Sequence, residues 1–428
     1  MPQAEKRKPA NNICETSNTM SKRTRARNNR SDTYVLTKLA NSQEISATNV
    51  PSTSTEITTD AGDTQPESSR KAVNTEHDDM YFDGYAFLDC HFTMISDYTR
   101  TKAYQRSIFR SYSAIYKRRV LEVGSGTGIL SIFAAQMGAA DVTAVEASLP
   151  MVNISRQLIE ANKFSHKIRV IHAKLEDYVA DIKSGTNALK YDVLISEWMG
   201  YTLFSEWMLD SVLLARDALL KTGGVMIPSQ AQLYLAPVSL PGFQQKEITK
   251  WKDLNNLYKV DFSCLADEEK RQLLHSGQMR VHQVLPQDII AHCQCIVDLD
   301  LTKISRSSVH DSCCTSNNNS NFESNYSFRC FGHSQLVGFT LWFSVLLPPD
   351  VTQTTSPFAE DQTHWEQTVI YLKEPVDVQQ DSLLEGTIRL LKSDVNKRCL
   401  KINLSLTVDK NLICDNFCVD EALSNIIE

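Results

Sequence analysis

Between residues 118 and 228 the chain alternates short apolar runs, typical of buried strands, with longer apolar segments typical of helices. A parallel sheet with crossover helices explains this alternation best. We expect strands within 118–124, 142–145, 167–172 and 191–196, and helices within 129–137, 151–161 and 206–220. Because no long structureless loop interrupts these elements, we predict one compact α/β domain over residues 80–228.

After Pro228 the hydrophobic period changes from helical to twofold, most clearly in residues 400–408. The sequence therefore predicts a second, β-rich domain over residues 229–428. Residues 243–274 interrupt it with helical spacing, which places Trp251, Leu254, Leu257 and Tyr258 on one apolar face. This face either packs locally or forms a dimer as a projecting arm. Residues 307–325 are of low complexity and predict a loose surface loop.

Residues 1–79 are polar and contain few large apolar side chains, so they predict a disordered tail. Its first 30 residues carry eight Lys or Arg against two Asp or Glu, in clusters at Lys6–Lys8 and Lys22–Arg27. Such clusters are typical of nuclear import signals, and a merely solvated tail is the alternative.

Composition and charge narrow the class of protein. Apolar residues make up 42% and charged residues 22% of the chain, as in soluble globular proteins, and no apolar run reaches the ~20 residues of a membrane span. Eleven cysteines without CxxC pairs indicate a reducing compartment and no structural metal. A net charge of -7 argues against direct nucleic-acid binding and is compatible with a basic protein substrate.

A glycine turn joins the first expected strand to the helix that follows it. Gly124, Gly126 and Gly128 allow the backbone to pass close to a ligand, and Glu146 ends the next strand, where an acid can bind a ribose diol. The G-x-G-x-G spacing differs from the G-x-G-x-x-G of dinucleotide sites and favours S-adenosylmethionine, which has no pyrophosphate. A purely structural tight turn is the alternative.

Two glutamates lie nine residues apart in the loop after the fourth expected strand. Glu197 and Glu206 are expected at the carboxyl edge of the sheet, where open α/β sheets bind ligands. Paired carboxylates suit a guanidinium, whose planar fork of donors matches them. Exposed loop acids are the alternative, which the apolar residues around them disfavour. His364, in the sequence THW, is a further candidate, although a lone histidine is more often structural.

The motifs also resemble those of the protein arginine methyltransferase family over residues 81–408. The pattern YF..Y.....H..M..D..RT..Y begins at Tyr81, and the glycine motif, AVEAS, the double-glutamate loop and THW follow in the family's order. Within the family the chain is most similar to a nuclear member that makes asymmetric dimethylarginine on histone tails. The segments that carry this match are SEWMGY, YKVDFSCL, GFTLWF and TSPFAEDQTHW.

The resemblance implies roles for single residues. It implies that the cofactor is held by His91, Arg100, Gly124, Glu146 and Glu176. Arg100 would pair with the methionine carboxylate and Glu176 would lie near the adenine. It also implies catalytic acids Glu197 and Glu206 with His364 and Asp97 as a supporting pair. Ser205 and Trp207 depart from the family pattern beside the second glutamate, which puts substrate preference in doubt.

Together these features predict a Rossmann-type methyltransferase domain, then a β-barrel domain with a helical dimerisation arm. The expected activity is a type I transfer of methyl groups from S-adenosylmethionine to arginine in basic protein tails, with those of histones as the expected substrates. A homodimer in the nucleus is expected. A catalytically weak scaffold or transcriptional coregulator of the same fold is the alternative, and a small-molecule methyltransferase, which needs no double-glutamate clamp, is a third reading.

Overall fold

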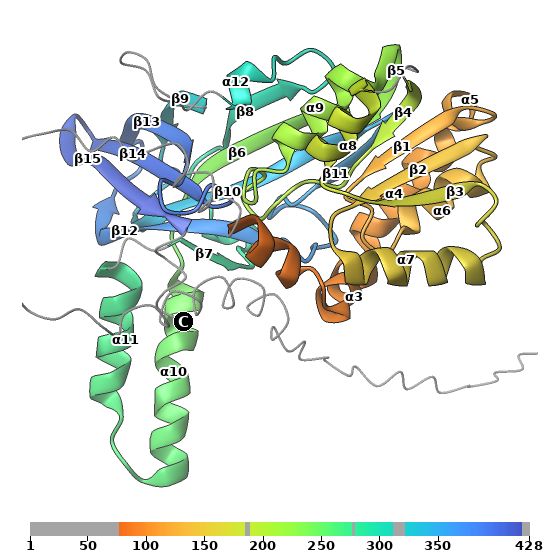
Figure 1. Ribbon diagram of the computed structural model, residues 1–428. Helices are drawn as coiled ribbons and strands as arrows, with labels where there is room; N and C mark the ends of the chain where they lie inside the picture. The colour runs from red at the N-terminus through yellow and green to blue at the C-terminus, as the bar shows by residue number, and fades with distance from the viewer. Residues whose placement is uncertain (1–76, 185–188, 276–278, 311–321, 422–428) are drawn as a thin grey trace, which may run out of the picture.

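The computed structural model of the protein describes residues 77–184, 189–275, 279–310 and 322–421. The two basic clusters of the expected tail lie outside these residues. Two layers of different construction dominate the molecule, a parallel sheet with helices around it and a group of antiparallel strands (Figure 1).

Five parallel strands form the first sheet, in the order β3-β2-β1-β4-β5. The strands are β1 (Arg119–Val123), β2 (Asp141–Glu146), β3 (Ile168–His172), β4 (Tyr191–Ile195) and β5 (Leu220–Ile227). The helices are α3 (Leu88–Ser96), α4 (Tyr98–Arg110), α5 (Tyr112–Ile115), α6 (Ile129–Gln136), α7 (Leu149–Ala161), α8 (Leu175–Ser184) and α9 (Leu209–Leu219). The strand order reverses between β1 and β4, so ligands are expected in the crevice at the carboxyl ends of these two strands.

The antiparallel strands form two sheets. One has the order β7-β12-β10-β6-β8, with β11 paired to β10, and the other has the order β15-β14-β13-β9. The first contains β6 (Gln230–Val238), β7 (Met279–His282), β8 (Gln294–Asp300), β10 (Ser334–Leu347), β11 (Val351–Thr354) and β12 (Gln367–Val378). The second contains β9 (Phe322–Arg329), β13 (Leu383–Lys392), β14 (Leu400–Val408) and β15 (Asn411–Asp420). In β14 every second residue is buried, as the twofold period predicts.

One hydrophobic core runs through both parts of the molecule and includes residues of the parallel sheet and of the antiparallel strands. Where the parts meet, the rings of Phe204 and Phe322 stack with their centroids 4.5 Å apart. This architecture confirms the predicted fold class, a Rossmann-type domain followed by a barrel-like β domain.

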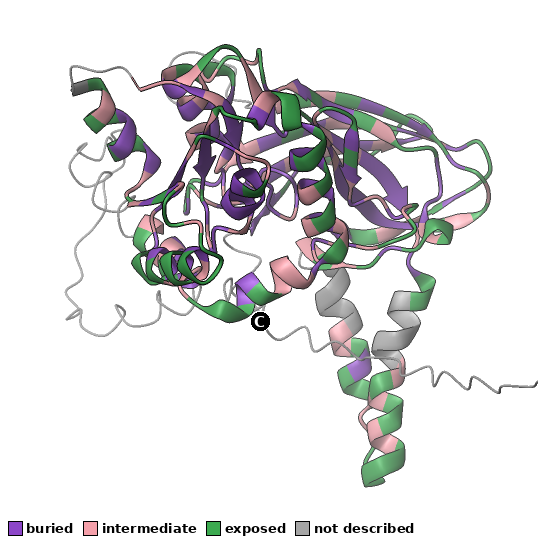
Figure 2. Ribbon diagram, turned by 90° about the vertical axis from the view of Figure 1, so that its right-hand side faces the viewer, coloured by how far each residue is buried: buried purple, intermediate pink, exposed green. Residues whose placement is uncertain are grey.

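The helical arm consists of α10 (Pro241–Tyr258) and α11 (Ser263–His275), which lie side by side and project away from the sheets (Figure 1). Residues 259–262 join the two helices. Most of the described arm surface is exposed or half-buried (Figure 2). Trp251 packs within the arm against the ring of Phe262, whereas Leu257 and Tyr258 are 68% and 62% exposed. The expected single apolar face is therefore divided between internal packing and the surface.

Three expected boundaries are wrong at their ends. Residues 77–79, at the end of the expected tail, belong to a helix that includes residues 77–84. The helix expected from Glu206 begins at Leu209 instead, because Glu206 and Trp207 have positive φ angles that a helix excludes. The loose loop expected over 307–325 includes the short helix α12 (Ser307–His310) and the first residues of β9, and residues 311–321 lie outside the described residues.

Within the described ranges, no helix is both long and apolar enough to span a membrane. The same residues contain no cluster of three or more His, Cys, Asp or Glu side chains arranged to hold a metal ion.

Candidate active site

The glycine turn between β1 and α6 forms one wall of the site. Gly124, Gly126 and Gly128 all have positive φ angles, of 69°, 52° and 79°. A Cβ added at Gly124 would collide with the side chain of Met208, and one at Gly126 would come 3.1 Å from His91. Glycine is therefore required here both by backbone conformation and by close packing.

Glu146 ends β2 and faces this turn. One of its carboxylate oxygens accepts a hydrogen bond from the backbone N–H of Gly126 at 2.7 Å, and the other accepts one from Ser148 at 2.8 Å. Burial raises the pKa of Glu146, while the backbone N–H groups act in the opposite direction. An ionised carboxylate has about four acceptor positions, and the backbone N–H of Ala147 also acts on this one, which leaves acceptor capacity for a ribose hydroxyl.

A single cleft lies over the glycine turn and contains about 1070 Å³ of space, open solvent included. The five residues expected to hold a cofactor all line it: His91, Arg100, Gly124, Glu146 and Glu176. His91 is fixed by a 2.9 Å contact between its Nε2 and the carbonyl oxygen of Tyr85, and burial lowers its pKa. Glu176 accepts a hydrogen bond from the hydroxyl of Ser211 at 2.6 Å. The structure thus brings the expected cofactor residues together from five separate segments.

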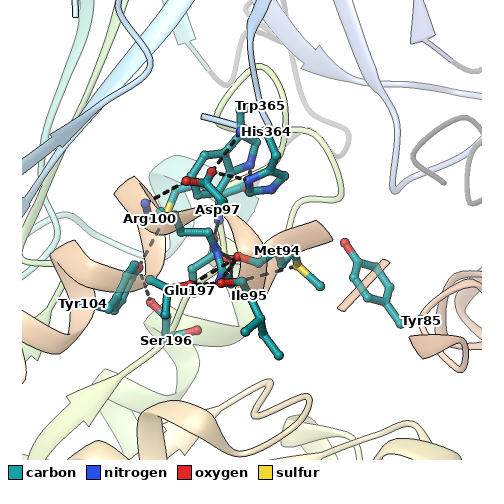
Figure 3. A network of polar contacts seen from close by, with 12 residues as sticks. Tyr85, Met94, Ile95, Asp97, Arg100, Tyr104, Ser196, Glu197, His364 and Trp365 are labelled. Carbon is teal, nitrogen blue, oxygen red and sulfur yellow. Dashed lines mark hydrogen bonds and ion pairs between the residues drawn. The ribbon is translucent and has the colours of Figure 1, made fainter. Parts of the chain in front are cut away.

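Glu197 follows β4 and is held by an arginine of helix α4 (Figure 3). The Nε and Nη2 atoms of Arg100 both donate to Oε2 of Glu197, the first at 3.0 Å, while Nη1 donates to the carbonyl oxygen of Met94 at 3.1 Å. Arg100 also lines the cleft, so it connects the cofactor side of the site with the glutamate loop. Its pairing with a methionine carboxylate stays a prediction.

Glu206 lies in the same loop and at the edge of the cleft. Its two carboxylate oxygens accept hydrogen bonds from the hydroxyls of Tyr81, at 2.7 Å, and Tyr85, at 2.8 Å. Burial raises the pKa of Glu206, the tyrosine hydroxyls act in the opposite direction, and the nearby charge of Glu197 raises it further. The two glutamates are therefore close enough to interact, as a pair that binds one cation requires.

His364 and Asp97 form a buried pair beside Arg100, as Figure 3 shows. Asp97 caps helix α4 by accepting from the backbone N–H of Arg100 at 2.9 Å, and its other oxygen accepts from both the backbone N–H and Nδ1 of His364, at 2.9 and 2.7 Å. Although burial acts against it, these hydrogen bonds hold the pKa of Asp97 below its usual value. The neighbouring Trp365 donates from Nε1 to the carbonyl oxygen of Met199 at 3.0 Å. The pair thus ties the β domain to α4 and to the glutamate loop.

Sequence reasoning missed several residues of this site. Tyr81 and Tyr85 belong to the quoted first-helix pattern, but nothing in their spacing indicates that they bind Glu206. Arg398 is 192 residues from Glu206, and its Nη1 donates to the Glu206 carbonyl oxygen at 3.1 Å. Its guanidinium also lies 4.5 Å from the ring centre of Tyr81. Glu122, a buried acid within the apolar strand β1, is the one missed residue with a local signal, since charged residues are rarely fully buried without a reason.

Comparison with known proteins agrees with this site. Residues 229–411 match the family model of the arginine methyltransferase oligomerization subdomain, and residues 110–257 match that of ribosomal protein L11 methyltransferase (PrmA). The fold and the site therefore define a methyltransferase with a Rossmann-type domain.

Individual relatives narrow the class. The chain is 38% identical over 345 residues to protein arginine N-methyltransferase 6 of Xenopus tropicalis. The matched region covers 80% of this chain and 95% of that protein. It is similar to the crystal structure of Arabidopsis thaliana protein arginine methyltransferase 10, with a TM-score of 0.63, 30% identity and coverage of 79% and 99% of the two chains. A crystal structure of PRMT6 with SAH has a TM-score of 0.62, 28% identity and coverage of 75% and 100%. The chain belongs to the protein arginine N-methyltransferase family.

Proposed function

We propose that the protein transfers methyl groups from S-adenosylmethionine to the guanidinium of arginine in basic protein tails, including those of histones. The products would be monomethylarginine and asymmetric dimethylarginine, as for a type I enzyme. The observation that carries this proposal is the pair of half-buried glutamates in one loop, of which Glu206 lines the cleft, each held in place by hydrogen-bond donors.

The cleft suits S-adenosylmethionine. The backbone approaches the ligand space at the glycine turn, and Glu146 retains acceptor capacity for a ribose hydroxyl. Arg100, which lines the cleft, supplies a positive charge for the methionine carboxylate. When bound, S-adenosylmethionine supplies an electrophilic methyl group on sulfur. The related structure of Trypanosoma brucei PRMT1 in its enzyme-prozyme complex contains AdoHcy, and it has a TM-score of 0.63 at 26% identity.

Glu197 and Glu206 would bind the substrate guanidinium as a clamp. Two carboxylates fix the plane of the guanidinium and point one terminal nitrogen toward the methyl group. They also draw positive charge to the other nitrogens, which leaves a lone pair to develop on the attacking nitrogen. Tyr81 and Tyr85 hold Glu206, Arg100 holds Glu197, and the Asp97–His364 pair holds the helix that carries Arg100.

Mass spectrometry of peptides incubated with the protein and isotopically labelled S-adenosylmethionine tests this proposal. Histone-tail peptides should gain label on arginine, and fragment ions should identify the asymmetric dimethyl form. Matched peptides with lysine in place of arginine should gain none. A protein that binds the cofactor and labels no peptide would be a scaffold, whereas symmetric dimethylarginine would contradict the proposed product.

We propose further that the arm mediates a homodimer. Leu257 and Tyr258 are exposed on it, and Phe87, Leu88 and Phe92, around the start of α3, are exposed as well. Exposed apolar patches on a globular protein commonly mark an interface. The name of the family model over residues 229–411 also refers to oligomerization. Sedimentation of the wild type and of the Leu257→Asp, Tyr258→Asp double variant at micromolar concentration should give a dimer and a monomer respectively. A monomeric wild type would contradict the proposal.

Nuclear residence is proposed from the sequence of the tail. Lys6–Lys8 and Lys22–Arg27 resemble import signals, and a 48.3 kDa chain enters the nucleus slowly by diffusion, more so as a dimer. A fluorescent fusion should be nuclear, and replacement of both clusters by alanine should move it to the cytoplasm. Nuclear signal that survives the replacement would contradict the import role of the clusters.

A further inference from the structure

We propose that Glu421 is a positioning residue for the catalytic loop, because its carboxylate joins Ser205, the neighbour of Glu206, to the first residue of β14. This contact, the Glu421 bridge, rests on the proposed catalytic role of Glu206. Glu421 directly follows β15, more than 200 residues from the loop it contacts.

The Glu421 bridge is buried on all sides. Glu421 is 8% exposed, and its Oε2 accepts a hydrogen bond from the backbone N–H of Leu400 at 2.7 Å. The side chain of Ser205 lies close enough to the same carboxyl group to act on its pKa, which it lowers. Ser205 is 3% exposed and lies 2.6 Å, hydroxyl to hydroxyl, from Thr202, which is 1% exposed. A buried carboxylate thus accepts a hydrogen bond from the β domain and interacts with a hydroxyl of the catalytic loop.

The loop needs such support because its backbone is in an unfavourable conformation. Glu206 and Trp207 have φ angles of 74° and 51°, in the left-handed region that side chains other than glycine rarely adopt. Consecutive residues of this kind persist only where surrounding contacts hold them. If the contacts were lost, the loop could relax, and the carboxylate of Glu206 would leave its place beside the cleft.

The β domain holds the loop at three consecutive residues. The backbone N–H of Glu206 donates to the carbonyl oxygen of Arg398 at 2.7 Å, and Nε1 of Trp207 donates to that of Cys399 at 3.2 Å. The Glu421 bridge adds the third connection, from Ser205 to Leu400. Loop residues 205–207 therefore contact residues 398–400 at three places. Of these three contacts, only the Glu421 bridge includes a carboxylate.

The charge of the bridge changes near neutral pH. Burial raises the pKa of Glu421 to about 7; the donors Leu400 and Ser205 act in the opposite direction, and the carboxylates of Glu206 and Asp420 raise it. The thiol of Cys399, whose pKa burial also raises, faces Glu421 from the turn before β14. The ionised carboxylate is the better acceptor for its donors, so protonation below pH 7 weakens the bridge. Turnover should therefore fall on the acid side partly through Glu421.

A double-mutant cycle on the full chain tests the proposal. The variants are Glu421→Ala, Ser205→Ala and the double substitution, with Glu421→Gln as the conservative variant and Asp415→Ala, exposed on β15, as the control. Peptide kcat and KM, cofactor affinity by calorimetry and thermal unfolding are measured for each. Glu421→Ala should lower kcat roughly tenfold with KM and cofactor affinity within about twofold, since only the position of Glu206 changes.

The cycle separates positioning from general stability. Ser205→Ala should lower kcat as well, and the double variant should be no slower than the slower single variant, because both remove one interaction. Glu421→Gln keeps an acceptor but not the charge, so it should recover only part of the kcat lost in Glu421→Ala and should flatten the pH profile between pH 6 and 8. Unchanged kcat in folded Glu421→Ala, or additive losses in the double variant, overturns the proposal. If Glu421→Ala does not fold, unchanged kcat in Ser205→Ala overturns it alone. An active Glu206→Gln would instead overturn the proposed role of Glu206.

Discussion

Arg100 donates from two nitrogens of its guanidinium to a single oxygen of Glu197, and the side chains are 10% and 9% exposed. Burial is the largest single effect on the pKa of Arg100 and lowers it. Coulomb attraction and hydrogen bonding to Glu197 outweigh burial together, so the pKa is raised. The other oxygen of Glu197 accepts only a long contact, 3.3 Å from the backbone N–H of Met199. One side of Glu197 is thus fixed by the protein and the other is available for a substrate guanidinium.

Arg100→Lys should abolish most of the activity. A lysine carries the charge but has a single nitrogen. It cannot replace the three nitrogens of the guanidinium, of which two donate to Oε2 of Glu197 and the third donates to the carbonyl oxygen of Met94. Hydrogen bonds to charged groups contribute about 1.5–3 kcal/mol, so we expect kcat/KM to fall roughly 10- to 100-fold. Steady-state kinetics with a histone-tail peptide measures this. Arg106→Lys, exposed on the same helix, is the matched control, and an equal loss in that control would indicate a general effect on α4.

Asp97→Asn should uncouple the β domain from α4. Asparagine offers one acceptor where Asp97 accepts three hydrogen bonds, two of them from His364. The pKa of Asp97 is depressed, so its stabilisation is complete above the unfolded value of 3.8 and is lost as the pH falls through the lower folded value. Urea unfolding should show a stability deficit at pH 7 that narrows toward pH 3. A deficit of the same size at both values, or one also seen in exposed Asp89→Asn, would contradict this account.

Local patterns were sufficient to predict most of the Rossmann-type domain. The strand at 118–124, the glycine turn and Glu146 follow one another within 30 residues, so their periodicity and spacing determine the contact that forms, Gly126 with Glu146. The twofold period of residues 400–408 predicted β14 equally well. These features depend on residues that are close in sequence, and the periodicity of apolar residues reports on such residues.

Contacts between distant segments could not be predicted in this way. Arg398 and Glu421 have no local signal, because their importance comes from packing against residues 205 and 206. The start of α9 was misplaced for a related reason. Residues 206–208 have good helical spacing, but hydrogen bonds from the turn before β14 hold Glu206 and Trp207 at positive φ. Tertiary contacts here override the local preference.

Asp78 should hold the helix over residues 77–84 in place beside the cleft. It pairs with Arg398 at 2.7 Å and with Lys174 at 3.2 Å, and both partners line the cleft. Asp78→Ala should weaken cofactor binding several-fold by calorimetry, with a smaller salt dependence than the wild type, because exposed ion pairs are screened by salt. Asp79→Ala is the matched control, because the Asp79 side chain is 69% exposed and its contact with Lys174 is long, at 3.9 Å. Equal affinities for the Asp78 and Asp79 variants would argue against this role.

Glu122 should make stability depend on pH. It is fully buried in β1 and accepts a hydrogen bond from Ser131, and burial raises its pKa to about 8. Since this folded value lies above the ordinary 4.5, the contribution to stability is complete below pH 4.5 and is lost as the pH rises through 8, at about 1.4 kcal/mol per pKa unit. Glu122→Gln should therefore be more stable than the wild type at pH 8 and similar to it at pH 5 in urea unfolding. Exposed Glu160→Gln should show no such difference, and a wild type as stable at pH 8 as Glu122→Gln would contradict the assignment.

The central claim is that Glu206 binds the substrate guanidinium rather than the cofactor. The direct measurement compares Glu206→Gln with the wild type in two assays on the same preparation, peptide methylation and calorimetric binding of S-adenosylmethionine. Glutamine keeps an acceptor for Tyr81 or Tyr85 but not the negative charge that the clamp requires. We expect methylation to fall roughly 100- to 1000-fold, the loss seen when an electrostatic stabiliser is removed, with cofactor affinity within about threefold. Near-normal turnover in the variant, or a loss of cofactor affinity that matches the loss of activity, would contradict the account.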